Sequence, residues 1–435
     1  MNPIKIGLLG LGTVGGGTLK VLQRNQEEIR RRAGRGIEVA LIAVRNVEKA
    51  RAIVQEAGAT VPVVGDPFAV VDSPEIDIVV ELIGGYDLTR ELVLRAIANG
   101  KHVVTANKAL IAVHGNEIFK AAHEKGVIVA FEAAVAGGIP VIKSLREGLG
   151  ANRIEWVAGI INGTGNYILT HMRDEGRAFE DVLAEAQALG YAESDPTFDV
   201  EGIDAAHKLT ILASIAYGVP LQFEKAFTEG ISRITAEDVE QADNLGYVIK
   251  HLGISKRTDQ GLELRVHPTL IPKERLLANV HGVKNAIAIM GDAVGPTLYY
   301  GAGAGAEPTA SAVVADLLDV ARDISTDHHY RVPYLAFSGI DEDVSQLPIM
   351  PMEDIITAYY LRLLAVDRPG VLARVATILA EQGISIEALI QKEATEGELV
   401  PIILLTHRTK EKQMNEAIRE IESMADIAGP LTRIR

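Results

Sequence analysis

An acidic segment followed by a lysine is the part of this sequence best suited to bind a small charged molecule. Residues 189–208 read LGYAESDPTFDVEGIDAAHK and place five carboxylates ahead of Lys208. Asp204 and Lys208 are four positions apart, so they share one face of a helix predicted over 203–217. Carboxylates can hold an ammonium group while a lysine serves an oxygen atom, and this combination suits a zwitterionic substrate.

Two other interpretations of the acidic segment stay open at this point. It could be a solvated loop with an exposed ion pair, which contributes only about 0.2–0.5 kcal/mol. It could also be a calcium loop, although the spacing of its carboxylates does not match the EF-hand pattern. The predicted helix is largely apolar around Asp204 and Lys208, which favours a face that is not plain surface.

A second lysine follows a predicted parallel strand. Residues 103–108 read VVTANK, which places Asn107 and Lys108 just beyond the carboxyl end of that strand. Ligands bind at this edge in open α/β sheets. Lys108 could therefore meet a substrate that is bound at this edge. The alternative is a surface lysine near the start of a helix.

The glycine-rich sequence close to the start of the chain predicts a dinucleotide site. An apolar run leads directly into G-x-G-x-x-G in the sequence IKIGLLGLGTVGGG. Gly10 permits a tight turn, Gly12 lets the backbone approach a pyrophosphate, and Gly15 lets helix and strand pack closely. A helix that begins at Thr13 and Val14 would offer free N–H groups to the phosphates. The alternative is a strand-to-helix turn without a ligand.

The residue after the second predicted strand bears on the choice of cofactor. An Asp or Glu at this position forms a hydrogen bond with the ribose 2′-hydroxyl of NAD in such folds. Here the strand ends at Val44 and Arg45 follows. A cation suits a 2′-phosphate, so the sequence favours NADP over NAD. The alternative is a solvated arginine on a loop.

Three regions with different patterns must position these residues. Residues 1–135 alternate strand-like and helix-like segments, as a doubly wound α/β sheet requires. The expected strands are 4–9, 37–44, 77–82, 101–105 and 127–131, and the expected helices are 13–31, 47–57, 88–99 and 114–125. Residues 136–325 read as an α+β domain with helices at 138–149, 162–174, 178–189, 203–217 and 307–323 and strands at 153–161, 227–232, 262–271, 283–290 and 295–300. We expect the segment 307–325 to pack back on the first domain.

The last part of the chain reads as a separate small module. Residues 326–353 contain several prolines and acidic residues and are expected to form a linker. Residues 354–435 then follow a β-α-β-β-α-β pattern, which predicts a ferredoxin-like fold. Its expected strands are 357–366, 384–391, 397–406 and 426–434, and its expected helices are 371–382 and 410–422.

The composition narrows the class of protein. The chain has 435 residues, enough for two or three domains, and 48% of them are hydrophobic. Its formal net charge of −15 argues against a nucleic-acid partner. No apolar run approaches the roughly 20 residues of a membrane span, and no signal-peptide layout is visible. Cysteine is absent, which excludes disulfides and a cysteine nucleophile. These features predict a cytoplasmic protein without a membrane partner.

Six motifs, taken together and in order, resemble homoserine dehydrogenase. They are GLGTVG, VTANKAL, FEAAVAGGIP, INGTGNYIL, LGYAESDPTFDVEGIDAAHKLTIL and YGAGAGAEPTASAV, and the match runs from residue 1 to about 325. The tail, LRLLAVDRPGVLARVATILAEQGISIEALIQ, is similar to an ACT-type regulatory domain. The resemblance implies a Rossmann-type nucleotide domain, an α+β catalytic and dimerisation domain, and a C-terminal ACT domain. It also implies reversible hydride transfer between L-aspartate 4-semialdehyde and L-homoserine, on the route to threonine and methionine.

The resemblance assigns roles to individual residues. Lys208 is the expected proton donor, and Lys108 is expected to lie beside substrate and nicotinamide. The expected substrate contacts are Glu193, Asp199, Asp204, Thr164 and Lys108. The cofactor contacts expected from the residues and the resemblance together are Gly10, Gly12, Thr13, Val14, Gly15, Arg45, Asn107, Lys108, Gly190, Glu193, Gly303 and Gly305. The family commonly has Asn-Gly-Thr-Thr-Asn where this chain has Gly165 in the fourth place.

The segment EAAVAGGIP, residues 132–140, gains meaning from the same resemblance. By itself it reads as a hinge whose carbonyls, with a glutamate, could hold a hard cation. A sodium-type ion in the family uses one glutamate side chain and three backbone carbonyls. The corresponding residues here are Glu132, Val135, Gly137 and Ile139. The resemblance therefore implies a structural monovalent cation such as sodium.

The ACT-type tail implies an effector. Pro369 and Gly370 allow a tight turn from strand to helix, and in ACT domains this loop commonly binds an amino acid at a dimer interface. We expect feedback inhibition by L-threonine and a homodimer or homotetramer; the alternative is a purely structural dimerisation unit.

Single features of the sequence distinguish the other candidate functions from this one. Aspartate-semialdehyde dehydrogenase handles the same aldehyde but needs a thiol, which this chain lacks. Another NADP-dependent oxidoreductase with a different zwitterionic substrate stays open. A non-catalytic sensor is the third hypothesis, and the pair Lys108 and Lys208 argues against it.

Overall fold

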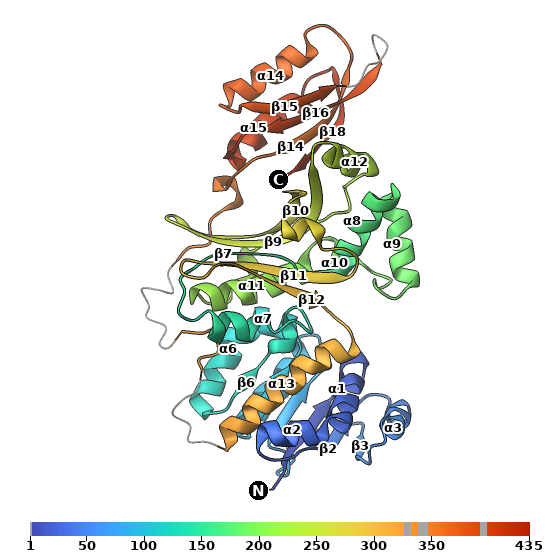
Figure 1. Ribbon diagram of the computed structural model, residues 1–435, viewed down its shortest axis with the longest axis vertical. Helices are drawn as coiled ribbons and strands as arrows, with labels where there is room; N and C mark the ends of the chain where they lie inside the picture. The colour runs from blue at the N-terminus through green and yellow to red at the C-terminus, as the bar shows by residue number, and fades with distance from the viewer. Residues whose placement is uncertain (1, 326–331, 338–346, 392–397) are drawn as a thin grey trace. The chain divides into compact units, whose positions relative to one another are not determined.

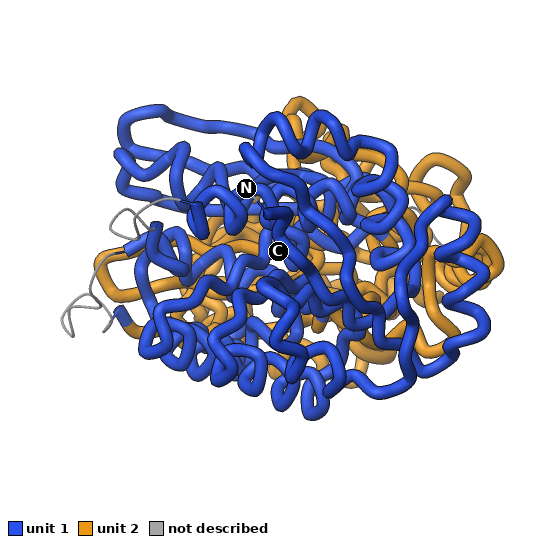
Figure 2. The backbone as a smooth tube through the Cα atoms, turned by 90° about the horizontal axis from the view of Figure 1, so that it is seen from below, with its two compact units in different colours: residues 1–163, 204–226, 283–347 blue, residues 164–203, 227–282, 348–435 orange. Residues whose placement is uncertain are grey.

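A computed structural model describes residues 2–325, 332–337, 347–391 and 398–435. The chain forms two compact units, each built from segments that are distant in sequence (Figure 2). The first unit contains residues 1–163, 204–226 and 283–347, and the second contains residues 164–203, 227–282 and 348–435. The expected linker 326–353 and the start of the expected strand 397–406 fall partly outside the described residues. Within the described ranges, no helix is both long enough and apolar enough to cross a membrane.

A six-stranded parallel sheet forms the N-terminal part of the first unit (Figure 1). Its order, β3-β2-β1-β4-β5-β6, is that of a doubly wound nucleotide-binding fold and confirms the predicted fold class. The order reverses between β1 and β4, so a crevice for ligands is expected at the carboxyl ends of these strands. The strands are β1 (Ile4–Leu9), β2 (Ile37–Ala43), β3 (Val63–Val64), β4 (Ile78–Glu81), β5 (His102–Thr105) and β6 (Val129–Ala130).

Helices connect these strands and cover the sheet. They are α1 (Thr13–Arg24), α2 (Gln26–Ala33), α3 (Val47–Glu56), α4 (Phe68–Val71), α5 (Asp87–Ala98) and α6 (Lys108–Lys125). The prediction of one helix over 13–31 is wrong, because the backbone of Asn25 leaves the helical region with φ −106° and ψ 20°. Helix α6 begins at Lys108 rather than at residue 114, since the side chain of Asn107 caps it.

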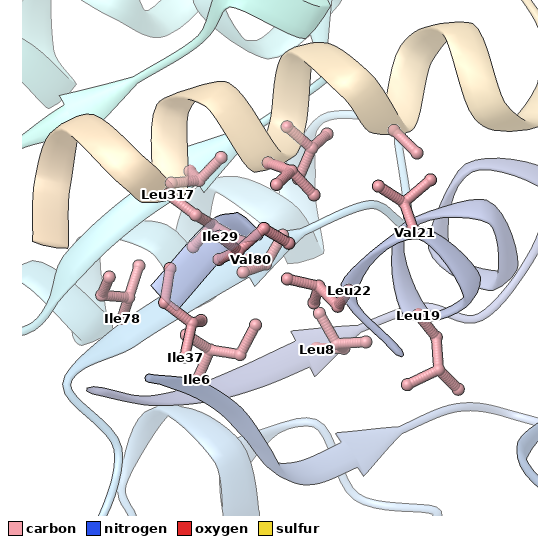
Figure 3. Close-up of a cluster of buried hydrophobic side chains, with 14 of the residues drawn as sticks. Ile6, Leu8, Leu19, Val21, Leu22, Ile29, Ile37, Ile78, Val80 and Leu317 are labelled. Carbon is pink, nitrogen blue, oxygen red and sulfur yellow. The ribbon is translucent and has the colours of Figure 1, made fainter. Parts of the chain in front are cut away.

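An apolar core fixes the glycine-rich turn against the sheet (Figure 3). Leu8 of β1 and Leu19 of α1 are fully buried in it, and Leu317 of α13 (Ala306–Ile324) joins them. A Cβ added at Gly17 would lie 2.4 Å from the carbonyl oxygen of the first residue of α13. Helices α1 and α13 therefore pack in close contact, which holds the start of α1 in place.

The rest of the first unit contains antiparallel strands and the helix that carries Lys208. The strands β7 (Ile154–Ile160), β11 (Lys284–Gly291) and β12 (Gly295–Ala302) are paired in the order β12-β11-β7. Helix α11 (Ile203–Tyr217) has the predicted bounds. The helix expected over 138–149 is instead a short helix α7 (Val141–Lys143) and a π-helical turn η2 (Ser144–Gly148), preceded by a 3-10 turn η1 (Glu132–Ala134). The helix cannot begin at residue 138, because the backbone of Pro140 lies outside the helical region with φ −77° and ψ 58°.

The second unit has its own strands and helices. The strands β8 (Phe227–Thr228), β9 (Tyr247–Thr258) and β10 (Gly261–Pro272) lie in the order β9-β10-β8. The helices are α8 (Gly163–Glu175), α9 (Phe179–Ala188), α10 (Thr197–Val200) and α12 (Ala236–Asn244), and short 3-10 turns cover Leu276–Asn279 and Met352–Asp354. A further 3-10 turn, Phe223–Lys225, belongs to the first unit. Strand β9 is not among the predicted strands, because Lys250 and His251 interrupt its apolar pattern although both are buried. The strand expected over 227–232 ends at Thr228, since the N–H of Ile231 bonds to the carbonyl of Val200 instead of to a strand.

The C-terminal module of the second unit has the predicted ferredoxin-like arrangement. Its antiparallel strands are β14 (Tyr360–Val366), β15 (Ile386–Gln391), β16 (Leu399–Thr406) and β18 (Ile427–Ile434), in the order β15-β16-β14-β18, and its helices are α14 (Val371–Glu381) and α15 (Glu411–Glu422). A two-stranded ribbon of β13 (Ile356–Thr357) and β17 (Thr409–Lys410) lies beside it. Leu363 and Val375 belong to a core between the sheet and its helices. Tyr360 and Ile403 belong to another core that also contains residues of α8, α9 and α12.

Candidate active site

The glycine-rich loop between β1 and α1 has the geometry that its sequence predicts. Gly10 has a φ of +98°, in the region that favours glycine. A Cβ at Gly15 would lie 2.3 Å from the carbonyl oxygen of Gly10, so only glycine allows this approach. A Cβ at Gly12 would meet no atom within 4 Å, and Gly12 is the N-cap of α1. The open space beside Gly12, together with the helix start at Thr13 and Val14, fits a pyrophosphate.

Glu81 shapes the neighbouring loop at the carboxyl end of β4. Its side chain is fully buried and accepts hydrogen bonds from the N–H groups of Ile83 at 2.8 Å and Gly84 at 2.9 Å. The hydroxyl of Thr105, at the end of β5, donates to Glu81 at 2.7 Å. Glu81 is not among the site residues predicted from the sequence. Its signal was a carboxylate at the end of an otherwise apolar strand.

Asn107 ties the loops after β4 and β5 together. Its Nδ2 donates to the carbonyl of Gly85 at 2.8 Å, and its Oδ1 accepts from the N–H of Leu110 at 3.0 Å. Asn107 is buried, so these bonds take place away from bulk water. They fix the first turn of α6 and with it the backbone of Lys108.

Asp204 brings the two predicted lysines together. Its Oδ1 lies 3.1 Å from Nζ of Lys108, and its Oδ2 accepts a hydrogen bond from Nζ of Lys208 at 2.7 Å. Asn162 donates to the same Oδ2 at 2.8 Å, and Lys208 also donates to the carbonyl of Ile161 at 2.8 Å. The Lys108 side chain is 35% exposed and that of Lys208 is 11% exposed, whereas Asp204 is buried. The cluster therefore presents two ammonium groups that one buried carboxylate orients.

The charge of Asp204 follows from its surroundings. Burial by itself would raise the pKa of Asp204, but the two ammonium groups and the amide of Asn162 hold it well below its usual value. Asp204 is therefore an anion at neutral pH. Its charge offsets that of the two cations and keeps them at one place.

His207 and Tyr86 lie beside this cluster. The Tyr86 hydroxyl is 3.5 Å from Nε2 of His207, and the His207 ring packs on Phe223 with the ring centroids 4.1 Å apart. Burial, assisted by the nearby lysines, lowers the pKa of His207 to about 4. The imidazole is therefore neutral at neutral pH and adds no third cation. Neither His207 nor Tyr86 is among the site residues predicted from the sequence.

Other predicted site residues lie in the second unit. Glu193 is exposed and Asp199, on α10, is half-buried. Gly190 follows α9 with a φ of +75°. The hydroxyl of Thr164, in the first turn of α8, donates to the carbonyl of Tyr191 at 2.7 Å. Helix α8 therefore holds the loop that carries Gly190 and Glu193.

The remaining predicted cofactor residues border the first sheet and α13. Gly305 is the N-cap of α13 with a φ of +126°, and a Cβ at Gly303 would lie 2.1 Å from the side chain of Asn285. Arg45 follows β2 and is exposed. In the part of the chain that the structure describes, Arg45 forms no ion pair. Asn46 beside it caps α3 through the N–H of Lys49.

Glu132 lies at the centre of the predicted cation site. It is 4% exposed, and its carboxylate accepts hydrogen bonds from the N–H groups of Ile142 at 2.9 Å and Lys143 at 2.8 Å. Burial raises the pKa of Glu132 to about 7. A bound cation would offset the cost of burying this carboxylate, so the residue fits the predicted role.

The backbone shortly after Glu132 contains two consecutive residues in the left-handed region. Ala136 and Gly137 have positive φ angles of 56° and 48°, which is rare for alanine. Gly137 is itself one of the three predicted carbonyl ligands, with Val135 and Ile139. Among the described residues, no cluster of three or more His, Cys, Asp or Glu side chains could hold a metal. A cation at this turn would therefore rely on backbone carbonyls and one carboxylate.

Family models cover most of the chain. The model described as "Homoserine dehydrogenase, NAD binding domain" matches residues 10–132, the homoserine dehydrogenase model matches residues 140–318, and the ACT domain model matches residues 359–426. A homoserine dehydrogenase of Pseudomonas aeruginosa is 67% identical over 436 residues, which cover 100% of this chain and 99% of the relative. A homoserine dehydrogenase of Bacillus subtilis is 39% identical over 427 residues, which cover 98% of this chain and 96% of the relative.

Solved structures agree with these matches. The crystal structure of a homoserine dehydrogenase from Thiobacillus denitrificans has a TM-score of 0.95 and 65% identity, and the match covers 100% of this chain and 98% of that one. A hyperthermophilic archaeal homoserine dehydrogenase in complex with NADPH has a TM-score of 0.62 and 26% identity, and the match covers 73% of this chain and 97% of that one.

Proposed function

Because the chain belongs to the homoserine dehydrogenase family and is an NAD(P)-dependent oxidoreductase acting on a CH–OH group, we propose that the Asp204 cluster interconverts L-aspartate 4-semialdehyde and L-homoserine. The observation that carries this proposal is the pairing of Lys108 and Lys208 on one buried carboxylate. Lys108 lies three residues after the end of β5, so the cluster adjoins the edge of the sheet where such folds bind their ligands.

The chemistry needs a hydride, a proton and a group that stabilises negative charge. The dihydronicotinamide, when bound, supplies the hydride to the aldehyde carbon. Negative charge then develops on the carbonyl oxygen, and the ammonium groups of Lys208 and Lys108 stabilise it. Lys208 gives this oxygen a proton, so that aldehyde, hydride and proton together yield the alcohol. Asp204 keeps both nitrogen atoms in place throughout.

Acidic residues account for recognition of the amino-acid part of the substrate. Glu193, Asp199 and Asp204 would hold its ammonium group, because carboxylates form strong charge-assisted hydrogen bonds with cations. Thr164 would contribute from the first turn of α8. No step of this reaction requires a covalent intermediate, in keeping with a chain that contains no cysteine.

The glycine-rich loop and Arg45 support NADP as the preferred cofactor. Asn107, Gly190, Gly303 and Gly305 would line the remainder of its site. The guanidinium of Arg45 is exposed directly after β2, where this fold places the group that contacts the ribose 2′ position. The archaeal relative was solved with NADPH. Arg45→Ala should therefore weaken NADP binding and leave NAD binding unchanged, and equal effects on both would contradict this assignment.

Two further ligands complete the proposal. Glu132 with the carbonyls of Val135, Gly137 and Ile139 would hold a structural sodium ion. The loop of the ACT module lines a pocket of 420 Å³ that would bind L-threonine as a feedback inhibitor in threonine and methionine biosynthesis. The homodimer or homotetramer predicted from the sequence belongs to the same proposal. The pocket is lined by residues that include Asp367, Arg368, Pro369, Gly370 and Gln391.

A spectrophotometric assay tests the reaction in both directions. We expect oxidation of NADPH with L-aspartate 4-semialdehyde and reduction of NADP with L-homoserine. Lys208→Ala should lower kcat about 10²- to 10⁴-fold, the usual contribution of general acid–base catalysis, and leave the affinity for NADP unchanged. Lys225→Ala is the matched control, because Lys225 is an exposed lysine. Activity of Lys208→Ala within about tenfold of the wild type would remove Lys208 from its role.

A further inference from the structure

Residues 229–232 connect the ACT module to the acidic substrate segment within the second unit. We propose that this coupling segment positions α10, which carries Asp199, and that Arg435 of the ACT module holds the coupling segment in place. The inference rests on the proposed function, because it names the route by which the regulatory module reaches the substrate residues. It assigns a positioning role to residues that do not touch the substrate.

The coupling segment packs directly on the end of α10. The N–H of Ile231 donates to the carbonyl of Val200 at 2.9 Å, and the hydroxyl of Ser232 donates to Oε1 of Glu201 at 2.6 Å. A Cβ at Gly230 would lie 2.2 Å from Oε2 of Glu201 and 2.7 Å from the carbonyl oxygen of Val200. No space separates the two segments at this point. A displacement of the coupling segment must therefore displace Val200 and Glu201.

A displacement of Val200 would reorient α10, which carries Asp199. Helix α10 is a single turn, Thr197–Val200, and Asp199 is its third residue. One turn of helix has little rigidity of its own, since most helix stability in proteins comes from packing. The orientation of Asp199 therefore depends on what holds the following residue, Val200.

The other side of the coupling segment is tied to the ACT module. Oε2 of Glu229 accepts a hydrogen bond from Arg435 at 2.9 Å and lies 3.5 Å from a guanidinium nitrogen of Arg433. The Arg435 side chain is fully buried and also donates to Glu411 of α15 at 2.9 Å. The backbone of Arg435 is anchored as well, because its carbonyl accepts from the N–H of Leu270 at 2.7 Å. The Glu229 side chain is 30% exposed while that of Arg435 is fully buried, and a charge-assisted hydrogen bond of this kind holds the two groups together strongly.

His251 provides a second contact between Glu229 and the substrate segment. Its Nε2 lies 3.0 Å from the carbonyl oxygen of Glu229, so Nε2 must be the protonated, donating nitrogen. In the described structure, Nδ1 is buried without a hydrogen-bond partner, and burial lowers the pKa of His251 to about 4. A Cβ at Gly202 would lie 3.1 Å from this ring, and Gly202 has a φ of +84°. The neutral imidazole therefore fills the space between Glu229 and Gly202, the residue that follows Glu201.

Two variants on the substrate side test the positioning role. Gly230→Ala should raise the KM for L-homoserine about 2- to 30-fold, the range in which mutations along a coupled network act, with kcat within about threefold of the wild type. Ser232→Ala removes only one hydroxyl and should raise this KM by less, in a protein with wild-type thermal stability. Arg374→Met is the control, because it removes an ion pair with Asp426 inside the ACT module.

A variant on the ACT side tests the link to regulation. Glu229→Gln keeps the shape of the side chain and removes its charge. In the wild type we expect L-threonine to raise the KM for L-homoserine. In Glu229→Gln the increase in this KM caused by L-threonine should be about threefold smaller, while calorimetry still shows L-threonine binding with wild-type affinity.

The outcomes separate this inference from the proposed function. If Gly230→Ala and Ser232→Ala both fold and leave the KM for L-homoserine unchanged, the coupling segment does not position α10. If L-threonine acts equally on the wild type and Glu229→Gln, Arg435 does not transmit the effector signal. A wild type that ignores L-threonine refutes the proposed regulation, and the two KM measurements then still decide the positioning role.

Discussion

At the scale of single residues, the chemistry depends on how one buried carboxylate orders two cations. Two ammonium groups close together repel each other, and long lysine side chains lose conformational entropy when they are fixed. Asp204 compensates for both effects with contacts of 3.1 Å and 2.7 Å to Lys108 and Lys208. The amide of Asn162 completes the shell around Asp204 without adding charge.

Removal of this charge should harm both activity and acid stability. Asp204→Asn should lower kcat/KM about 10²-fold or more, because neither lysine keeps its position. The pKa of Asp204 is lower in the folded chain than in the unfolded chain. The carboxylate therefore contributes stability above its unfolded pKa, and this contribution is lost as the pH falls below that value. Urea unfolding of the wild type and of Asp204→Asn across pH 3 to 7 measures the difference.

The matched control for this prediction is Glu180→Gln. It makes the same carboxylate-to-amide change at an exposed position in the first turn of α9. We expect it to leave kcat/KM and the loss of unfolding free energy at acidic pH unchanged. If Asp204→Asn and the wild type lose the same unfolding free energy as the pH falls, Asp204 is not held as a buried anion.

The sequence indicated this cluster only in part. The i, i+4 spacing of Asp204 and Lys208 and the strand before Lys108 could be recognised, because both are local features. Glu81 left a local signal that was not used, a carboxylate at the end of an apolar strand. His251 left none, since the carbonyl of Glu229 that it bonds to lies in a segment distant in sequence, and the partners of a buried polar residue of this kind are known only from the structure.

At the scale of secondary-structure elements, a buried lysine anchors α8. Lys250 of β9 is 1% exposed, and its Nζ donates to Oδ1 of Asn166 at 2.9 Å and to the carbonyl of Val280. Asn166 in turn donates to the carbonyl of Gly282 at 2.8 Å. Among the described residues, Lys250 forms no ion pair. The first turn of α8, which carries Thr164, is therefore fixed by a buried lysine amine without a carboxylate partner.

This anchor predicts a distinct dependence of stability on pH. Burial lowers the pKa of Lys250 to about 7, whereas an unfolded lysine titrates near a pKa of about 10.4. Between these pH values the unfolded chain binds more protons, so the free energy of unfolding rises with pH, by up to about 1.4 kcal/mol per pH unit. Lys250→Met should remove this slope in urea unfolding between pH 7 and 10. Lys273→Met, with a lysine side chain that is 41% exposed, should keep it.

The turn after Glu132 makes a second prediction at this scale. If Glu132 and its neighbouring carbonyls hold sodium, NaCl should raise the melting temperature above that in an equal concentration of N-methylglucamine chloride, because a ligand of the native state stabilises it. Glu132→Gln should lose this difference while it folds normally in both salts. An equal effect of the two salts on the wild type would contradict the cation site.

Helices and strands could be predicted from the sequence where their burial produces a regular apolar pattern. The strands of the parallel sheet are apolar runs because both faces are covered, and the sequence placed four of them, β1, β2, β4 and β5, close to their observed bounds. The same logic failed for β9, whose buried polar residues break the run. It also failed at Asn25, where a local change of backbone direction divides one helical pattern into two helices.

At the scale of the whole molecule, the ACT module is part of the core of the second unit. Tyr360, Ile403 and Ile434 are buried in one cluster with residues of α8, α9 and α12. Arg362 of β14 donates to both carboxylate oxygens of Asp238, at 2.6 Å and 3.0 Å, and Asp238 is fully buried. Removal of residues 354–435 would expose this core and would deprive the buried Asp238 of its ion pair with Arg362. We therefore expect the truncated chain to aggregate, and regulation must be tested in the full chain.

A point substitution in the effector pocket makes that test. Gln391→Ala shortens a side chain that lines the 420 Å³ pocket and donates to Asp367 at 3.3 Å, and it leaves the core shared with α8 intact. In Gln391→Ala we expect the inhibition constant for L-threonine to rise about tenfold, because a site that loses a polar partner loses about 1.4 kcal/mol of binding. The values of kcat and KM without L-threonine should stay at wild-type levels, since the pocket lies in the ACT module and not among the substrate residues. Initial rates of homoserine oxidation at increasing L-threonine, with Gln382→Ala outside the pocket as the control, measure both quantities. Unchanged inhibition in Gln391→Ala would show that the effector binds elsewhere on the chain.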